Sequence, residues 1–149
     1  NNYALAAQYY ELYLKRFSWS PYCKDRPDVV YTTLGAVYLD MGDMIKARAM
    51  TAEALKINPR NPKPHIVNGM ISVTEKDYEV AERHFQSAIA LDQMDTLSRF
   101  NLVDLYVTTE QYKKAIEALE ELVKMNNLGP DRSKVLAKLD KLKRIEGNK

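Results

Sequence analysis

The sequence predicts an all-α fold, a solenoid of antiparallel helix pairs, and a repeat of 34 residues is the main reason. Gly35 is followed at that spacing by Gly69, and Ala47 is followed by Ala81 and then Ala115. Apolar residues also recur at helical spacing in both halves of each 34-residue segment. Each segment should therefore form two helices that bury one face by stacking on the neighbouring segment.

Residues 1–17 are expected to form one helix, the second helix of a truncated repeat. Its apolar residues Ala6, Tyr10, Tyr13 and Leu14 follow the spacing of Ala81, Phe85, Ala88 and Ile89. Because the first helix of that repeat would then be missing, self-association through the N-terminal helix stays open. Charged substitutions of Tyr10 and Leu14 should break such a dimer.

Residues 18–27 are expected to form a loop insertion, because Pro21 and Pro27 oppose a helix there. Trp19 and Tyr22 could contact a partner or could fix the loop onto neighbouring helices. Cys23 is the single cysteine and cannot form an internal disulfide, so the sequence does not specify a redox compartment.

Three repeats are expected at residues 28–61, 62–95 and 96–129. In each repeat the first helix should end at a short turn, and the second helix should begin at Met44, Tyr78 or Tyr112. A glycine inside a helix costs up to about 1 kcal/mol relative to alanine. Gly35 and Gly69 are therefore expected where a neighbouring helix comes too close for a side chain.

The first repeat carries a family resemblance. The pattern Tyr31-x2-Leu34-Gly35-x2-Tyr38, followed by Ala47, Ala54 and Pro59, resembles the tetratricopeptide repeat. The resemblance implies a right-handed superhelix whose first helices line a concave groove. The later repeats depart from the pattern at His65, Asn68, Ser72, Arg99 and Val103.

Residues 130–146 are expected to form a C-terminal capping helix with one apolar face. The tail from Pro130 carries 7 basic and 3 acidic residues, a net charge of +4. A basic amphipathic helix could bind nucleic acid or an anionic membrane surface, which is the alternative function. Capping is preferred, because a repeat stack needs a polar terminal surface.

Motifs for catalysis are missing from the sequence. It has no Gly-rich phosphate loop, no Gly-x-Ser-x-Gly, no Cys-x2-Cys and no His-Glu-x2-His. His65 and His84 fall on different expected helices without a cysteine nearby, so neither a metal site nor a cofactor is expected. The sequence predicts a protein that is not an enzyme.

The longest apolar runs are too short to span a bilayer, so a soluble chain is expected. Because the sequence begins at Asn1, a targeting segment could have been removed. A cytoplasmic location and an exported or periplasmic one both stay open.

The repeat register predicts which residues line the groove and bind a partner. Asn101 and four rows across successive first helices are expected there: Val29, Lys63 and Leu97; Thr32, Ile66 and Phe100; Ala36, Met70 and Asp104; Leu39, Val73 and Val107. The rows are mostly apolar, so an apolar or amphipathic peptide or helix is the expected ligand. The alternative is that the protein fills these rows with its own segments.

Members of the resembled family that bind the acidic tails of chaperones use a clamp of lysines and asparagines. Here Thr32, Ala36, Val67 and Leu97 stand at clamp positions, so a carboxylate-clamp adaptor is disfavoured. The expected function is a non-catalytic scaffold or adaptor module that binds another protein, as part of a larger assembly protein.

Overall fold

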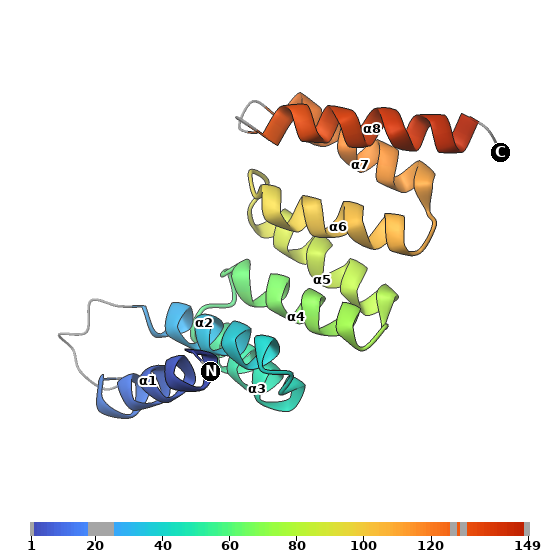
Figure 1. The fold of residues 1–149 in the computed structure, drawn as a ribbon. Coiled ribbons are helices and arrows are strands. Elements are labelled where there is room, and N and C mark those ends of the chain that lie inside the picture. The colour runs from blue at the N-terminus through green and yellow to red at the C-terminus, as the bar shows by residue number, and fades with distance from the viewer. Residues whose placement is uncertain (1, 18–25, 126–127, 129–130, 148–149) are drawn as a thin grey trace.

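The computed structural model describes residues 2–17, 26–125, 128 and 131–147, which form eight α-helices and no strand. The helices are α1 (Asn2–Phe17), α2 (Pro27–Asp40), α3 (Met44–Ile57), α4 (Lys63–Thr74), α5 (Tyr78–Leu91), α6 (Thr96–Thr108), α7 (Tyr112–Lys124) and α8 (Arg132–Gly147). Figure 1 shows them stacked in sequence order, with α1 and α8 at opposite ends. The all-α solenoid predicted from the repeat is confirmed.

The stack has two layers. We call α2, α4 and α6 inner helices, because α2 contacts α4 and α4 contacts α6. We call α3, α5 and α7 outer helices. Each packs between the inner helix of its own repeat and the helix that follows it in the chain, which is α4, α6 or α8. The predicted starts at Met44, Tyr78 and Tyr112 are confirmed.

The turns inside the three repeats share one backbone geometry. Gly42, Lys76 and Glu110 follow one another at the repeat spacing, and all have positive φ angles, of 80°, 63° and 57°. The next residue caps the outer helix in two cases. The Asp43 carboxylate accepts a hydrogen bond from the Lys46 amide, and the Asp77 carboxylate accepts one from the Val80 amide.

The two helix glycines lie at close helix contacts, as predicted. A Cβ atom on Gly69 would lie 2.4 Å from Cε1 of Phe85. A Cβ atom on Gly35 would lie 3.0 Å from Cγ2 of Thr51. A side chain at Gly69 would therefore overlap the Phe85 ring, whereas one at Gly35 would require a small shift of its neighbours on the outer helix.

The expected alignment of α1 with the outer helices is wrong by one helical turn. The Tyr38 hydroxyl donates a hydrogen bond to Glu11, and the equivalent Tyr106 hydroxyl donates one to Glu82 at 2.7 Å. Glu11 therefore corresponds to Glu82, which pairs Tyr10 rather than Ala6 with Ala81. The insertion between α1 and α2 breaks the 34-residue spacing, so spacing alone could not fix this register.

The position of Leu14 corrects the predicted dimer face. Leu14 is buried and packs, together with the half-buried Tyr10, in the core that α1 shares with α2. A charge at Leu14 would therefore disrupt the fold rather than a surface contact.

The expected loop lies mostly outside the described residues, as do Trp19, Tyr22 and Cys23. Pro27 was expected in this loop, but it begins α2. Proline is favoured at the first position of a helix, where its missing N–H would have no helical partner.

Candidate functional site: the concave face

A hollow of about 380 Å³ opens between the inner helices α2, α4 and α6. Met70 lies on α4, the middle one of these three helices, and is 41% exposed. The hollow is lined by Leu39, Asp40, Met70, Val73, Thr74, Phe85, Asn101, Asp104, Leu105 and Thr108.

The structure brings five of the residues expected in the groove together in this hollow. They are Leu39, Met70, Val73, Asn101 and Asp104. The other expected residues lie elsewhere. Lys63 and Leu97 are exposed, while Ala36, Phe100 and Val107 are half-buried. Val29 lines a separate hollow beside α1.

Thr32 and Ile66 were expected to line the groove, but both are buried. The Thr32 hydroxyl donates a hydrogen bond to the Asp28 carbonyl at 2.6 Å, and Ile66 packs in the same core as Phe85. Each inner helix packs against the neighbouring inner helices as well as against the outer helices. The side chains of Thr32 and Ile66 therefore lie between helices rather than in the groove.

The sequence reading missed several residues that line the hollow. Phe85 comes from an outer helix and reaches the hollow beside the side-chain-free Gly69. Asp40, Thr74 and Thr108 form a further row at the repeat spacing, one residue beyond the expected row of Leu39, Val73 and Val107. The repeat could have revealed that row, whereas the contribution of Phe85 depends on helix approach.

Some polar side chains of the hollow have hydrogen-bond partners, and one does not. The Thr74 hydroxyl donates to the Met70 carbonyl at 3.0 Å, and the Thr108 hydroxyl donates to the Asp104 carbonyl at 2.8 Å. The Asn101 amide nitrogen is buried and has no hydrogen-bond partner among the described residues. Asn101 therefore carries a buried donor without a partner beside a hollow that is lined by both apolar and polar side chains.

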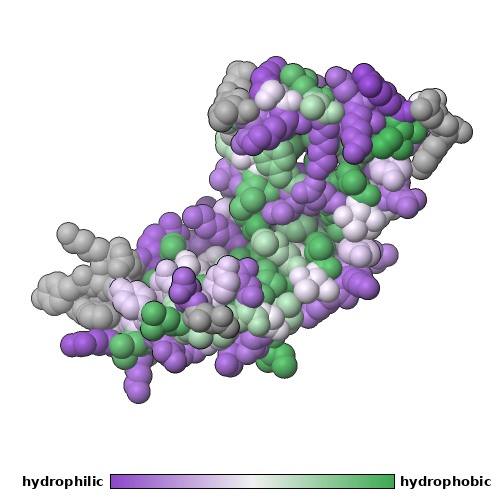
Figure 2. All heavy atoms as spheres, viewed as in Figure 1, coloured by the Kyte–Doolittle hydropathy of each residue, from purple (hydrophilic) through white to green (hydrophobic). Residues whose placement is uncertain are grey.

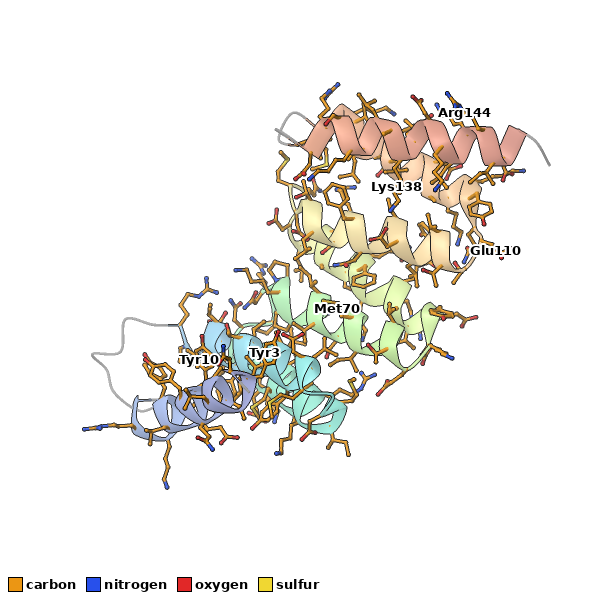
Figure 3. All side chains as sticks on the ribbon, in the orientation of Figure 1. Tyr3, Tyr10, Met70, Glu110, Lys138 and Arg144 are labelled. Atoms are coloured by element: carbon orange, nitrogen blue, oxygen red, sulfur yellow. The ribbon has the colours of Figure 1, made fainter. Side chains whose placement is uncertain are left out.

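An ion pair lies at the C-terminal end of the concave face. Lys138 of α8 follows Asp104 at the repeat spacing and pairs with its carboxylate. Figure 3 shows the Lys138 side chain extending from α8 toward α6. In Figure 2, hydrophilic side chains gather over α8 at the top of the view, and hydrophobic ones are exposed lower, over α4 to α6.

The two histidines form a pair that does not line the hollow. The ring centroids of His65 and His84 are 5.8 Å apart. Burial lowers the pKa of His65, and burial followed by the nearby His65, Arg48 and Arg83 lowers the pKa of His84. Within the described part of the chain, no group of three metal-ligating side chains forms around them.

Among the described residues, no helix has both the length and the apolar character needed to cross a bilayer.

Family models and curated proteins match the chain along most of its length. Two models, both described as tetratricopeptide repeat, match residues 29–61 and 72–139. The type IV pilus assembly protein PilF of Pseudomonas aeruginosa is 26% identical over 116 residues, or 78% of this chain and 46% of PilF. Anaphase-promoting complex subunit 3 of Schizosaccharomyces pombe is 32% identical over 109 residues, or 73% of this chain and 16% of that subunit. The chain thus spans less than half the length of either relative.

Solved structures share the fold at low sequence identity. The first TPR of Spaghetti (RPAP3), bound to the HSP90 peptide SRMEEVD, has a TM-score of 0.70 and 18% identity, covering 81% of this chain and 96% of that chain. MamA has a TM-score of 0.68 and 18% identity, covering 98% of this chain and 90% of that chain. The 34-residue spacing, the stacked helix pairs and both family models agree that the chain belongs to the tetratricopeptide repeat family.

Proposed function

We propose that the chain is a non-catalytic protein-interaction module whose concave face binds an apolar or amphipathic peptide or helix. The hollow between α2, α4 and α6 is the observation on which this proposal rests. It exposes a large part of Met70, whose flexible thioether side chain adapts to the shape of an apolar ligand.

The polar groups of the hollow suit a backbone ligand. A rotation of the Asn101 side chain would bring its buried amide nitrogen to a peptide carbonyl, and the nitrogen would then gain the partner that it lacks. Leu39, Met70 and Val73 would contact apolar side chains of the same ligand. A few placed polar groups in an apolar surface orient a ligand while burial supplies affinity.

The relatives support a role in an assembly. PilF is a type IV pilus assembly protein, and anaphase-promoting complex subunit 3 is named as part of a complex. The RPAP3 domain is bound to an HSP90 peptide. We propose a different ligand class here, because clamp positions in this chain carry Thr32, Ala36, Val67 and Leu97.

The basic C-terminal helix remains the less supported alternative. Three of its cations already pair with carboxylates: Lys134 with Asp131, Lys138 with Asp104 and Lys143 with Glu120. Binding through this helix would weaken steeply with salt, whereas binding through the hollow would not.

Selection of peptides on the wild-type chain from a displayed random library tests the proposal. Peptides that bind should lose most of their affinity for Met70→Glu, because the charge would be buried against apolar ligand atoms. Met41→Glu is the matched control, because Met41 is 44% exposed and lies outside the hollow. Undiminished binding to Met70→Glu would show that the concave face is not the site.

A further inference from the structure

The hollow on the concave face lies at the C-terminal ends of the three inner helices. Helices α2, α4 and α6 end at Asp40, Thr74 and Thr108, and all three residues line the hollow. Figure 1 shows the three helices running in the same direction, so these ends lie along one edge of the stack. The C-terminal end of a helix carries a partial negative charge, because its last carbonyl groups have no partner within the helix. The ends of three helices therefore give this edge of the hollow a negative potential.

The described ends of α2, α4 and α6 carry no basic side chain that offsets this charge. The last turn of each helix contains no lysine or arginine. The turns that follow, at residues 41–43, 75–77 and 109–111, hold Asp43, Glu75, Asp77 and Glu110 and one basic residue, Lys76. Two of these carboxylates pair with cations of the outer helix α3, Asp43 with Lys46 and Glu75 with Arg48. The side chains at this edge therefore add no net positive charge to the negative helix ends.

The two aspartates that line the hollow differ in their partners. Lys138 of α8 pairs with the Asp104 carboxylate and neutralises its charge. Asp40 is exposed, and its carboxylate has no ion pair or hydrogen bond with the described part of the chain. Among the described residues that line the hollow, none is a lysine or an arginine. The hollow therefore has an unpaired negative charge on its α2 side.

The position of Asp40 is unfavourable for the helix that carries it. A carboxylate at the last residue of a helix lies beside the negative end of the helix dipole. A cation bound at this place would interact favourably with both the carboxylate and the helix end. Helix stability thus gives no reason for an aspartate here, whereas recognition of a cation does.

We propose that the peptide bound on the concave face carries a lysine or arginine side chain that pairs with Asp40. This inference rests on the proposed function of the hollow and adds the charge of its ligand. Apolar side chains next to the cation lie on Met70 and Val73 of α4, and the peptide continues toward Asn101 of α6. Lysine and arginine suit this arrangement, because their hydrocarbon chains can cross an apolar surface while the charged group reaches the carboxylate.

Parallel peptide selections on the wild-type chain and on Asp40→Lys test the charge preference. A displayed random library supplies the probes. Peptides count as ligands of the hollow only if their binding is lost on adding Met70→Asn, which removes the apolar side chain without introducing a charge. Lysine and arginine should be enriched among the wild-type ligands relative to the unselected library. Aspartate and glutamate should replace them among the ligands of Asp40→Lys, because the charge at this position is reversed.

Affinities of synthetic peptides then measure the contact itself. Asp40→Asn should weaken the best wild-type ligand about threefold to tenfold, which lies between the effects of exposed and buried ion pairs. Replacing the lysine or arginine of the peptide by glutamine should cost as much, and both changes together should cost little more than either alone. Asp140→Asn is the matched control, because Asp140 is an exposed aspartate outside the hollow. Asp40→Asn should not weaken the fold, since it removes an unfavourable charge from a helix end.

Two results would overturn this proposal, and they differ in what they imply for the hollow. Peptides that need Met70 but show no excess of basic residues, or that bind Asp40→Asn as tightly as the wild type, would keep the binding site and remove its charge preference. Peptides that all bind Met70→Asn undiminished would remove the binding site itself, and the cationic ligand with it.

Discussion

At one repeated contact, the second and third repeats differ in side-chain size on both helices of the pair. Gly35 faces Thr51, and Gly69 faces Phe85. The equivalent residues of the third repeat are Val103 and Leu119, which are buried in the same core. The larger outer residue Phe85 is matched by glycine, and the smaller Leu119 is matched by valine. Between the second and third repeats a smaller outer residue therefore goes with a larger inner one, whereas both residues are small in the first repeat.

The first prediction concerns this difference between the second and third repeats. Gly69→Val should destabilise the protein by about 1–3 kcal/mol, because the new side chain overlaps the Phe85 ring. Adding Phe85→Leu, which copies the Val103–Leu119 pair, should recover much of this loss. Urea unfolding of the wild type, both single variants and the double variant gives the coupling energy, and strictly additive effects would contradict this prediction.

A buried carboxylate joins the start of the first repeat to its end. Asp28 is 2% exposed, and its Oδ2 atom accepts hydrogen bonds from Arg26 at 2.8 Å and from Asn58 and Asn61 at 2.9 Å each. Burial by itself would raise the pKa of Asp28, but the hydrogen bonds from Asn58 and Arg26, the Arg26 charge and the Asn61 hydrogen bond lower it below 3.8. The ionised form is the one that the fold stabilises.

The second prediction follows from the lowered pKa of Asp28. Because this pKa is lower in the folded chain, the ionised carboxylate contributes stability above pH 3.8 and loses it as the pH falls through the folded pKa. Asp28→Asn should be less stable than the wild type at neutral pH by about 1–3 kcal/mol. This difference should shrink as acid titrates the wild-type carboxylate. Urea unfolding across the acidic range checks it, and exposed Asp140→Asn, the control, should show no such trend.

The helix pairs depend on a turn that requires a left-handed backbone. Gly42 adopts a positive φ at low cost, but Lys76 and Glu110 adopt it as well. A residue with a Cβ atom pays roughly 1–2 kcal/mol in this conformation. Two of the three turns are therefore strained relative to the first.

The third prediction is that Lys76→Gly and Glu110→Gly each stabilise the protein. The gain should be at most about 1 kcal/mol, because glycine also increases the entropy of the unfolded chain. Gly42→Ala should act in the opposite direction at the equivalent turn. Chemical denaturation measures all three, and a loss of stability in both glycine variants would show that the turns carry no strain.

The molecule as a whole contains two apolar cores, one reaching from α1 to α4 and one from α4 to α8. The contact between α3 and α4 includes a polar pair. The Thr51 hydroxyl donates a buried hydrogen bond to the Asn68 side-chain oxygen at 2.7 Å. The equivalent positions at the next contact between repeats hold the apolar Phe85 and Leu102. The stack is therefore less apolar between the first and second repeats.

The fourth prediction is that the two parts of the molecule open separately. Amide hydrogens of α2 and α3 should exchange faster than those of α5 and α6, because nearest-neighbour contacts determine the stability of a repeat stack. Native-state hydrogen exchange followed by NMR measures this difference. Thr51→Val/Asn68→Leu, which replaces the polar pair by apolar residues, should reduce it. Equal protection of all four helices in the wild type would contradict the prediction.

The 34-residue spacing was sufficient to predict the helix pairs, the starts of the outer helices and the close contacts at Gly35 and Gly69. Turn chemistry and helical periodicity are local, so they can be read along the chain. Five expected groove residues meet in the hollow, but Thr32 and Ile66 do not, and Phe85 was missed. Whether a side chain of an inner helix reaches the groove depends on how neighbouring helices cross. The register of α1 depends on the contact between Tyr38 and Glu11, which lie on either side of the insertion in the chain. Both are contacts between helices, and their geometry is set by packing in three dimensions rather than by the order of residues.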